Sequence, residues 1–158
     1  MNLFFEEHQK VLTALTEHKV HFMLIGGYAV NYHGYSRTTG DMDVWTKPDN
    51  ENKLLLLQAL LKLGFDEGGI KEIESWDFTK PQLFHILDKP YRTDFLTYVS
   101  GVKYTEAEQE IITGEFEHIL VPFININHLI RSKQNTGRLK DLADIEYLNK
   151  IILLKNKK

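Results

Sequence analysis

The sequence predicts an α/β (α+β) fold in one domain over residues 1–158, with a small mixed β-sheet flanked by helices. In its first half, short strand-like segments alternate with segments of helical period, a pattern typical of a sheet covered by helices. The chain has 158 residues, a usual length for a single domain. No internal repeat, low-complexity linker or change of composition divides it.

The first half alternates helices and strands. Apolar residues near helical spacing open the chain, an apolar run then leads into Gly26-Gly27, and acidic and apolar residues alternate in DMDVWT. Pro48 and Asp49 are typical of a helix start, and Gly64 of a helix end. The predicted elements are a helix over 3–18, a strand over 22–25, a helix over 28–34, a strand over 41–46 and a helix over 48–63.

The second half is less regular. The turn-like DKPYR separates two strand-like segments, and Asn135 and Gly137 separate two helical ones. The predicted elements are strands over 83–87, 93–98 and 118–122, and helices over 126–133 and 139–154.

Composition excludes several classes of protein. The chain has no cysteine, which excludes disulfides and thiolate metal sites. No apolar run approaches the roughly 20 residues of a membrane span, and the first residues lack the pattern of a signal peptide, so we expect a cytoplasmic protein without membrane contact. The net charge of −3 gives no overall attraction to nucleic acid. A polyanion would need a local site, for which the candidates are Arg131, Lys133, Arg138 and Lys140.

Asp41 and Asp43 form an acidic pair on the second predicted strand. Residues i and i+2 of a strand point to the same face, so the two carboxylates lie side by side and repel each other. A divalent cation relieves this repulsion, and Mg²⁺ is usually held by one or two carboxylates together with phosphate oxygens and water. The alternative is a solvent-facing strand edge without a ligand.

Two further features favour the metal site. Asp94 lies in RTDFLT, another alternating segment that places one more acid on a strand. Gly26 and Gly27 follow a strand and open a helix, where the backbone can approach a phosphate closely. A lone glycine pair also fits an ordinary tight turn, but the ordered set of strand, Gly-Gly, helix, acid pair and later acid is more specific.

The segment LIGGYAVNYHGYSRTTGDMDVWT resembles the signature of the nucleotidyltransferase superfamily that includes DNA polymerase beta. It is most similar to small bacterial abortive-infection and toxin–antitoxin nucleotidyltransferases, whose R-x-[S/T]-x-D-h-D pattern is matched by Arg37, Thr39, Asp41 and Asp43. Their downstream helical motif is matched by Lys133, Arg138, Lys140, Asp141, Asp144 and Leu148.

This resemblance implies transfer of a nucleoside monophosphate from a nucleoside triphosphate to an acceptor hydroxyl. Asp41 and Asp43 would bind two Mg²⁺ ions, and Asp94 would complete one metal site and help deprotonate the acceptor. The implied nucleotide-binding residues are Gly26, Gly27, Arg37, Thr39 and Lys133, with Lys133 as a point charge for the β and γ phosphates. For Arg37, capping of a surface turn is an equal alternative.

Several choices stay open at this stage. The acceptor is a protein side chain, a tRNA end or a small molecule such as an antibiotic, and the oligomeric state has no signature. A rival hypothesis is a non-catalytic regulatory or partner-binding protein that kept the fold, such as a toxin–antitoxin component. A second alternative is a phosphohydrolase using the same acids. We expect Asp141 and Asp144 to pair with Arg138 and Lys140 at helical spacing, and of the histidines only His33 and His85 to lie near the cleft.

Overall fold

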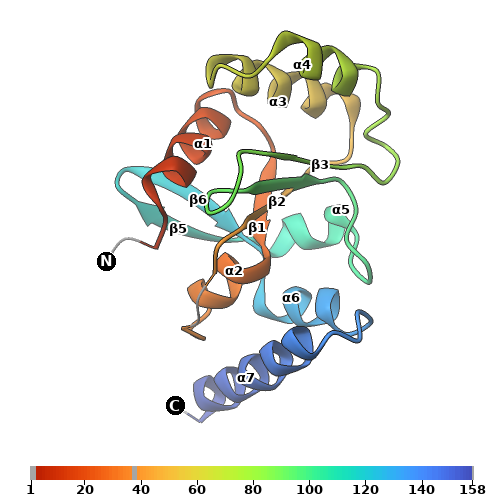
Figure 1. The fold of residues 1–158 in the computed structure, drawn as a ribbon. Helices are drawn as coiled ribbons and strands as arrows, with labels where there is room; N and C mark the ends of the chain where they lie inside the picture. Colours follow the sequence, from red (N-terminus) through yellow and green to blue (C-terminus); the bar gives the residue numbers. More distant parts are fainter. Residues whose placement is uncertain (1–2, 37–38, 158) are drawn as a thin grey trace.

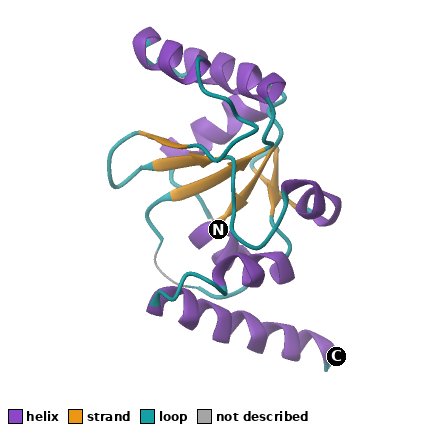
Figure 2. Ribbon diagram, turned by 90° about the vertical axis from the view of Figure 1, so that its right-hand side faces the viewer, coloured by secondary structure: helices purple, strands orange, loops and turns teal. Residues whose placement is uncertain are grey.

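A computed structural model describes residues 3–36 and 39–157. A mixed sheet forms its centre (Figures 1 and 2). The sheet has six strands in the order β3-β4-β2-β1-β6-β5. Neighbouring strands β2–β4 and β1–β6 are parallel, whereas β1–β2, β3–β4 and β5–β6 are antiparallel. The strands are β1 (Phe22–Ile25), β2 (Met42–Thr46), β3 (Leu83–Ile86), β4 (Thr93–Leu96), β5 (Ile112–Phe116) and β6 (Ile119–Phe123). The mixed sheet of the predicted fold class is therefore confirmed.

Helices cover both faces of this sheet. Figure 1 shows α1, α3 and α4 on one side, with α2, α6 and α7 on the other. The long helix α7 lies outermost and packs mainly on α6. The helices are α1 (Glu6–Glu17), α2 (Gly26–Tyr32), α3 (Asn50–Lys62), α4 (Glu67–Glu74), α5 (Tyr104–Ala107), α6 (Ile126–Lys133) and α7 (Leu139–Asn156), with a 3₁₀ turn η1 (Glu108–Glu110) after α5.

Alternation along the central strands separates core from cleft. On β2, Met42 and Val44 are fully buried, while the intervening Asp43 is only half-buried. On β4, Thr93 and Phe95 are likewise buried. Because successive side chains of a strand point to opposite faces, burying one set directs the acidic set to the other face. The hydrophobic core thus fixes where the carboxylates point.

Most predicted elements are present, and their differences have local causes. The strand over 22–25 and the helix over 126–133 are confirmed to the residue. The predicted strand over 118–122 is found as β6, one residue later. Three elements, β5, α4 and α5, were not predicted from the sequence. β5 is an edge strand with a mostly exposed face and a glycine inside it, and α4 begins with Glu67-Gly68-Gly69, so neither shows a clear period.

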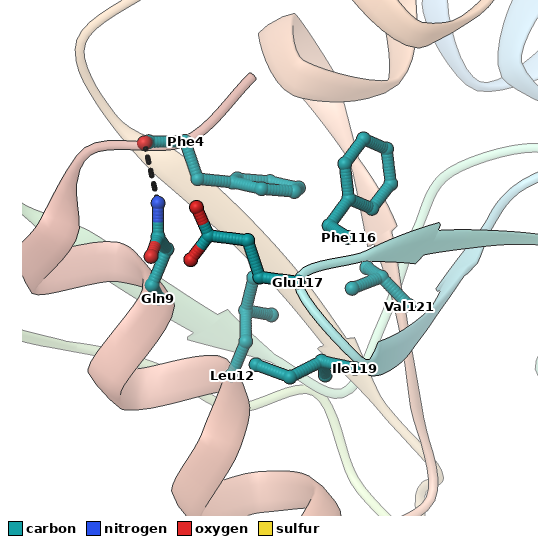
Figure 3. Close-up of a pocket in the computed structure, with 7 residues that line it drawn as sticks. All are labelled: Phe4, Gln9, Leu12, Phe116, Glu117, Ile119 and Val121. Atoms are coloured by element: carbon teal, nitrogen blue, oxygen red, sulfur yellow. Dashed lines mark hydrogen bonds between the residues drawn. The ribbon is translucent and has the colours of Figure 1, made fainter. Parts of the chain in front are cut away.

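A small space remains where α1 meets the β5–β6 hairpin (Figure 3). Phe4 and Phe116 pack edge to face there, and Gln9 Nε2 donates to the Phe4 carbonyl at 3.1 Å. Its volume of about 10 Å³ is at the lower limit for one water molecule. This space is therefore a packing feature and no ligand site. Among the described residues, no helix is long and apolar enough to cross a membrane.

Candidate active site

The parallel pairing of β2 with β4 brings two of the predicted acids together. Asp43 is the register partner of Asp94, and adjacent strands lie about 4.8 Å apart. Asp41 precedes β2 by one residue, two positions before Asp43. All three aspartates line one large cleft. The convergence expected from the sequence is therefore present at the level of the backbone and the cleft lining.

Gly26 explains how a buried aspartate fits at this point. Ile25 is the register partner of Asp43 on β1, and Gly26 follows it with φ +66°, a conformation that favours glycine. A Cβ at Gly26 would collide with the carboxylate of Asp43. The glycine thus makes room for Asp43, a role additional to the phosphate approach predicted from the sequence. Gly27 and Gly26 both line the cleft.

The charges of these acids are incompletely balanced. Burial, followed by the negative charges of Asp94 and Asp41, raises the pKa of Asp43 from 3.8 to about 7. Asp94 has a partner of its own, since Arg92 Nε donates to its Oδ1 at 3.1 Å. Among the described residues, no side-chain hydrogen bond or ion pair reaches Asp43. A buried carboxylate in this state would be stabilised by an added cation.

The carboxylate oxygens of this site are of the type that magnesium binds. It prefers oxygen ligands and needs only one or two carboxylates when phosphate oxygens and water supply the rest. Burial, together with the negative charges of Asp94 and Asp41, raises the pKa of Asp43, and a bound cation would offset these effects. In residues 3–36 and 39–157, however, no three His, Asp or Glu side chains already stand as a ready ligand set. Asp94 would have to share its carboxylate between Arg92 and a metal ion.

The cleft is large and has a second wall made by α6 and α7. Its volume is about 810 Å³, within the usual range of small-molecule sites. The residues that α6, α7 and their connection contribute are polar or charged: Ser132, Lys133, Thr136, Arg138, Lys140 and Asp141. Thr39 and Gly40 lie at the approach to β2. The acids of the sheet therefore face a cavity whose other wall is rich in cations.

Lys133 is buried in this second wall between two acids. Its Nζ lies 3.1 Å from Asp141 Oδ1 and 3.1 Å from Asp144 Oδ2. Arg138 Nε and Thr136 Oγ1 each donate to Asp141 Oδ2 at 2.7 Å. Burial opposes ionisation of Asp141, but the hydrogen bonds from Thr136, Lys133 and Arg138 outweigh it and lower its pKa. The predicted pairing of Asp141 with Arg138 is confirmed, and Asp144 pairs with Lys133.

Some sequence expectations lie elsewhere. Arg37 is outside the described residues. His33 is buried with its Nε2 against the Ile124 carbonyl, and neither His33 nor His85 lines the cleft. His85 nevertheless lies beside the cleft, as expected, because it is the register partner of Asp94, whereas His33 packs against the backbone after β6. Arg131 also turns away, because it is hydrogen-bonded to Glu106 and to the Gly101 carbonyl.

Sequence reasoning missed two cations of the cleft. Lys89 and Arg92 line it beside Asp94. Both belong to the turn DKPYR, which has no secondary-structure period. The sequence signal for Arg92 was its position two residues before Asp94, from which its side chain can reach the Asp94 carboxylate.

A buried histidine connects this turn to the glycine pair. His8 of α1 is fully buried, and burial lowers its pKa, which favours the neutral ring. Its Nε2 lies 2.9 Å from the Tyr91 carbonyl, an acceptor, so Nε2 carries the proton. Its Nδ1 then accepts from the Tyr28 hydroxyl at 2.7 Å. α1, the helix after Gly26-Gly27 and the turn before Asp94 are thus held together behind the acids.

Comparison with known proteins agrees on the fold. No protein-family model and no curated protein sequence matches the chain. Among solved structures, the lincosamide antibiotic adenylyltransferase LnuA with bound lincomycin aligns with a TM-score of 0.57 and 15% identity, over 96% of this chain and 99% of that one. ANT(2'')-Ia in complex with adenylyl-2''-tobramycin aligns with a TM-score of 0.53 and 15% identity, over 95% and 93%.

A third solved structure also aligns with the chain. An antigenic nucleotidyltransferase-like protein from Paracoccidioides brasiliensis has a TM-score of 0.51 and 17% identity, over 94% of this chain and 75% of that one. At such identities the likeness concerns the fold alone. The chain has the nucleotidyltransferase fold.

Proposed function

We propose that this chain is a Mg²⁺-dependent nucleotidyltransferase that moves a nucleoside monophosphate from a nucleoside triphosphate to an acceptor hydroxyl. One observation carries the proposal: Asp43 and Asp94 are register partners on β2 and β4, and both line the cleft that Gly26 also lines. The fold supports the same reaction class, because LnuA is an adenylyltransferase and ANT(2'')-Ia holds an adenylylated product.

The residues have distinct roles in this scheme. Asp41 and Asp43, with Asp94, would hold the magnesium ions, and when bound, two such ions steady the attacking and leaving oxygens of an in-line displacement. Gly26 and Gly27 leave the backbone open to the phosphates. Thr39 lies at the entrance to β2 and offers a hydroxyl, while Arg37 stays a predicted phosphate ligand.

The second wall would neutralise the triphosphate. Lys140 and Arg138 line the cleft and are exposed, so both can turn to a phosphate. Lys133 has two carboxylate partners and one donor left, and acts as a fixed positive charge near the site. Its charge already acts on Asp43, as does that of Lys140.

The transfer itself balances without a further reactant. The acceptor oxygen bonds to the α-phosphorus, the bond from that phosphorus to the β-bridging oxygen breaks, and pyrophosphate leaves. Asp94 accepts the acceptor proton on Oδ2, because Arg92 occupies Oδ1.

Thermal shift and product analysis test this function. We expect Mg²⁺ with a nucleoside triphosphate to raise the melting temperature, and an acceptor to trigger pyrophosphate release. Asp41→Ala/Asp43→Ala should abolish both effects. Asp66→Asn is the matched control, since Asp66 is an exposed helix cap without a capping hydrogen bond.

Each contrary result identifies a rival. Indifference to metal and nucleotide would favour a non-catalytic partner-binding protein, such as a toxin–antitoxin component. Release of phosphate or nucleoside monophosphate without any acceptor would indicate a phosphohydrolase.

A further inference from the structure

The strand that carries Asp94 continues into an exposed apolar surface. Leu96 follows Asp94 at i+2 on β4 and shares its face, and Tyr98 lies two residues beyond the end of this strand. Leu83 of the edge strand β3 is the register partner of Leu96. All three line the cleft, where Leu83 is 63% exposed and Tyr98 is 59% exposed. We call Leu83, Leu96 and Tyr98 the apolar platform.

The platform begins where an acceptor would have to lie. Strand residues rise about 3.3 Å each, which places Leu96 about 7 Å along β4 from Asp94, and Tyr98 follows just after the strand ends. A hydroxyl at Asp94 would therefore set one or two rings of its own molecule over these side chains. The α6–α7 wall, with its cations, is the separate part of the cleft that suits a triphosphate.

Isolated apolar side chains on a surface are common and need no partner. These three differ because they line the same cleft as the acids, and Leu83 and Leu96 are cross-strand neighbours. Apolar lining with a few placed polar groups is the usual composition of a small-molecule site. The platform thus fits a ligand with an apolar or aromatic face.

Charge in the cleft restricts the class further. Its lining carboxylates are Asp41, Asp43, Asp94 and Asp141. The first three belong to the proposed metal site, and Asp141 is engaged by Lys133, Arg138 and Thr136. Within the described lining, no carboxylate is left to pair with ammonium groups of an acceptor. Lys89 and Arg92 lie on the acceptor side and would repel them.

We propose that the acceptor is a hydroxyl compound with an apolar or aromatic face and no cluster of ammonium groups, and that it packs on Leu83, Leu96 and Tyr98. This assignment rests on the proposed nucleotidyl transfer. It separates this cleft from one built for a polyamine sugar, which needs acids around its amines.

A binding experiment tests the platform without turnover. The probe is 8-anilinonaphthalene-1-sulfonate, an aromatic anion, added to the full chain with Mg²⁺ and ATP. We expect a fluorescence increase that falls at least about threefold in Leu83→Ser and in Tyr98→Ser. Leu153→Ser is the control, because Leu153 is 60% exposed on α7 and does not line the cleft. An equal loss in the control, or no loss in the two platform variants, would overturn the proposal.

Tobramycin serves as the polycationic probe in the same conditions. We expect no calorimetric binding at submillimolar concentration to the wild-type chain, and measurable binding after Leu83→Glu/Tyr98→Glu, which adds acids to the platform. Submillimolar binding by the wild-type chain would overturn the proposal.

A transfer experiment then seeks the acceptor itself. A cell extract is split on a cation-exchange resin, and each fraction is incubated with the enzyme, Mg²⁺ and α-labelled nucleoside triphosphate. We expect labelled product from the unretained fraction, with the acceptor KM raised about tenfold in Tyr98→Ser and the nucleotide Kd unchanged. Product from the retained polycations alone would overturn the acceptor class. No product from either fraction would overturn the transfer reaction, whereas the two binding results bear on the platform alone.

Discussion

Two groups of buried aspartates lie on two walls of the same cleft, and they are balanced in opposite ways. On the sheet wall, burial and neighbouring acids raise the pKa of Asp43 to about 7. On the helix wall, Asp141 is more deeply buried than Asp43, yet its pKa is lowered, because Thr136, Lys133 and Arg138 hydrogen-bond to it. The same residue type in the same cleft therefore has two different states.

The difference separates acids that are already neutralised from acids that are not. A buried carboxylate with its own cation and hydrogen bonds is already satisfied. One with neighbouring acids is satisfied only by adding positive charge or a proton. In the helix wall, the ion pairs of Lys133 join α6 to α7. In the sheet wall, no ion pair among the described residues balances the charge of Asp43.

The largest effect is expected from breaking the balanced group. Lys133→Met leaves two buried carboxylates without their shared cation, and removing one partner of a buried ion pair typically costs about 3–5 kcal/mol. Urea unfolding followed by circular dichroism measures this. Lys150→Met is the control: Lys150 pairs with Glu146 at 3.5 Å on an exposed helix face, and we expect a change below about 0.5 kcal/mol. Similar losses in both variants would show that Lys133 is not buried between acids.

The next largest effect is expected at Asp43, among the acids of the sheet wall. Asp43→Asn keeps the shape of the side chain and removes its charge, so we expect transfer to fall by about 100–1,000-fold or more, the scale for losing a transition-state contact. Without divalent ions the same variant should melt higher than the wild type at pH 8, because a buried charge is gone. Single-turnover rates and thermal melts measure the two. Loss of both activity and stability in Asp43→Asn would contradict the inference that Asp43 needs a cation.

The pH dependence of stability follows from the same carboxylate. Its pKa is raised from 3.8 to about 7 on folding, so between these values the folded state binds more protons than the unfolded one, and the free energy of unfolding falls as pH rises. The contribution of Asp43 is complete below pH 3.8 and lost above pH 7, at up to about 1 kcal/mol per pH unit. We expect wild type without divalent ions to lose stability relative to Asp43→Asn between pH 5 and 7. Parallel curves for the two proteins would contradict this.

The sequence predicted the sheet wall better than the helix wall, for a physical reason. Asp43 and Asp94 lie on strands and Asp41 lies directly before one, and strand alternation is local, so their shared face can be read without knowing the fold. Lys133 was predicted as a cation for phosphate, but its burial between Asp141 and Asp144 depends on how α6 packs against α7. Tertiary contacts of this kind leave no period in the sequence.

The acceptor side was beyond reach for a related reason. Leu83 and Tyr98 read as ordinary strand residues, but Leu83 lies on the edge strand β3 and Tyr98 lies beyond the end of β4, and both are exposed. Lys89 and Arg92 lie in a turn, where position relative to Asp94 is set by the path of the chain. Gly26 was predicted at a phosphate turn, and its second role, room for Asp43, needed the pairing of β1 with β2.

The smallest effect is expected from the hydrogen bonds that support the sheet wall. Behind the acids, neutral hydrogen bonds replace ion pairs: the Tyr28 hydroxyl donates to His8, and His8 donates to the Tyr91 carbonyl. Tyr28→Phe removes one of these bonds, so we expect a loss of about 1 kcal/mol in urea unfolding and faster amide hydrogen exchange confined to residues 88–92. Tyr147→Phe, on an exposed ring of α7, should change neither measurement. If exchange in 88–92 stays at the wild-type rate in Tyr28→Phe, the turn before Asp94 is held by other contacts, and the sheet wall does not depend on this neutral relay.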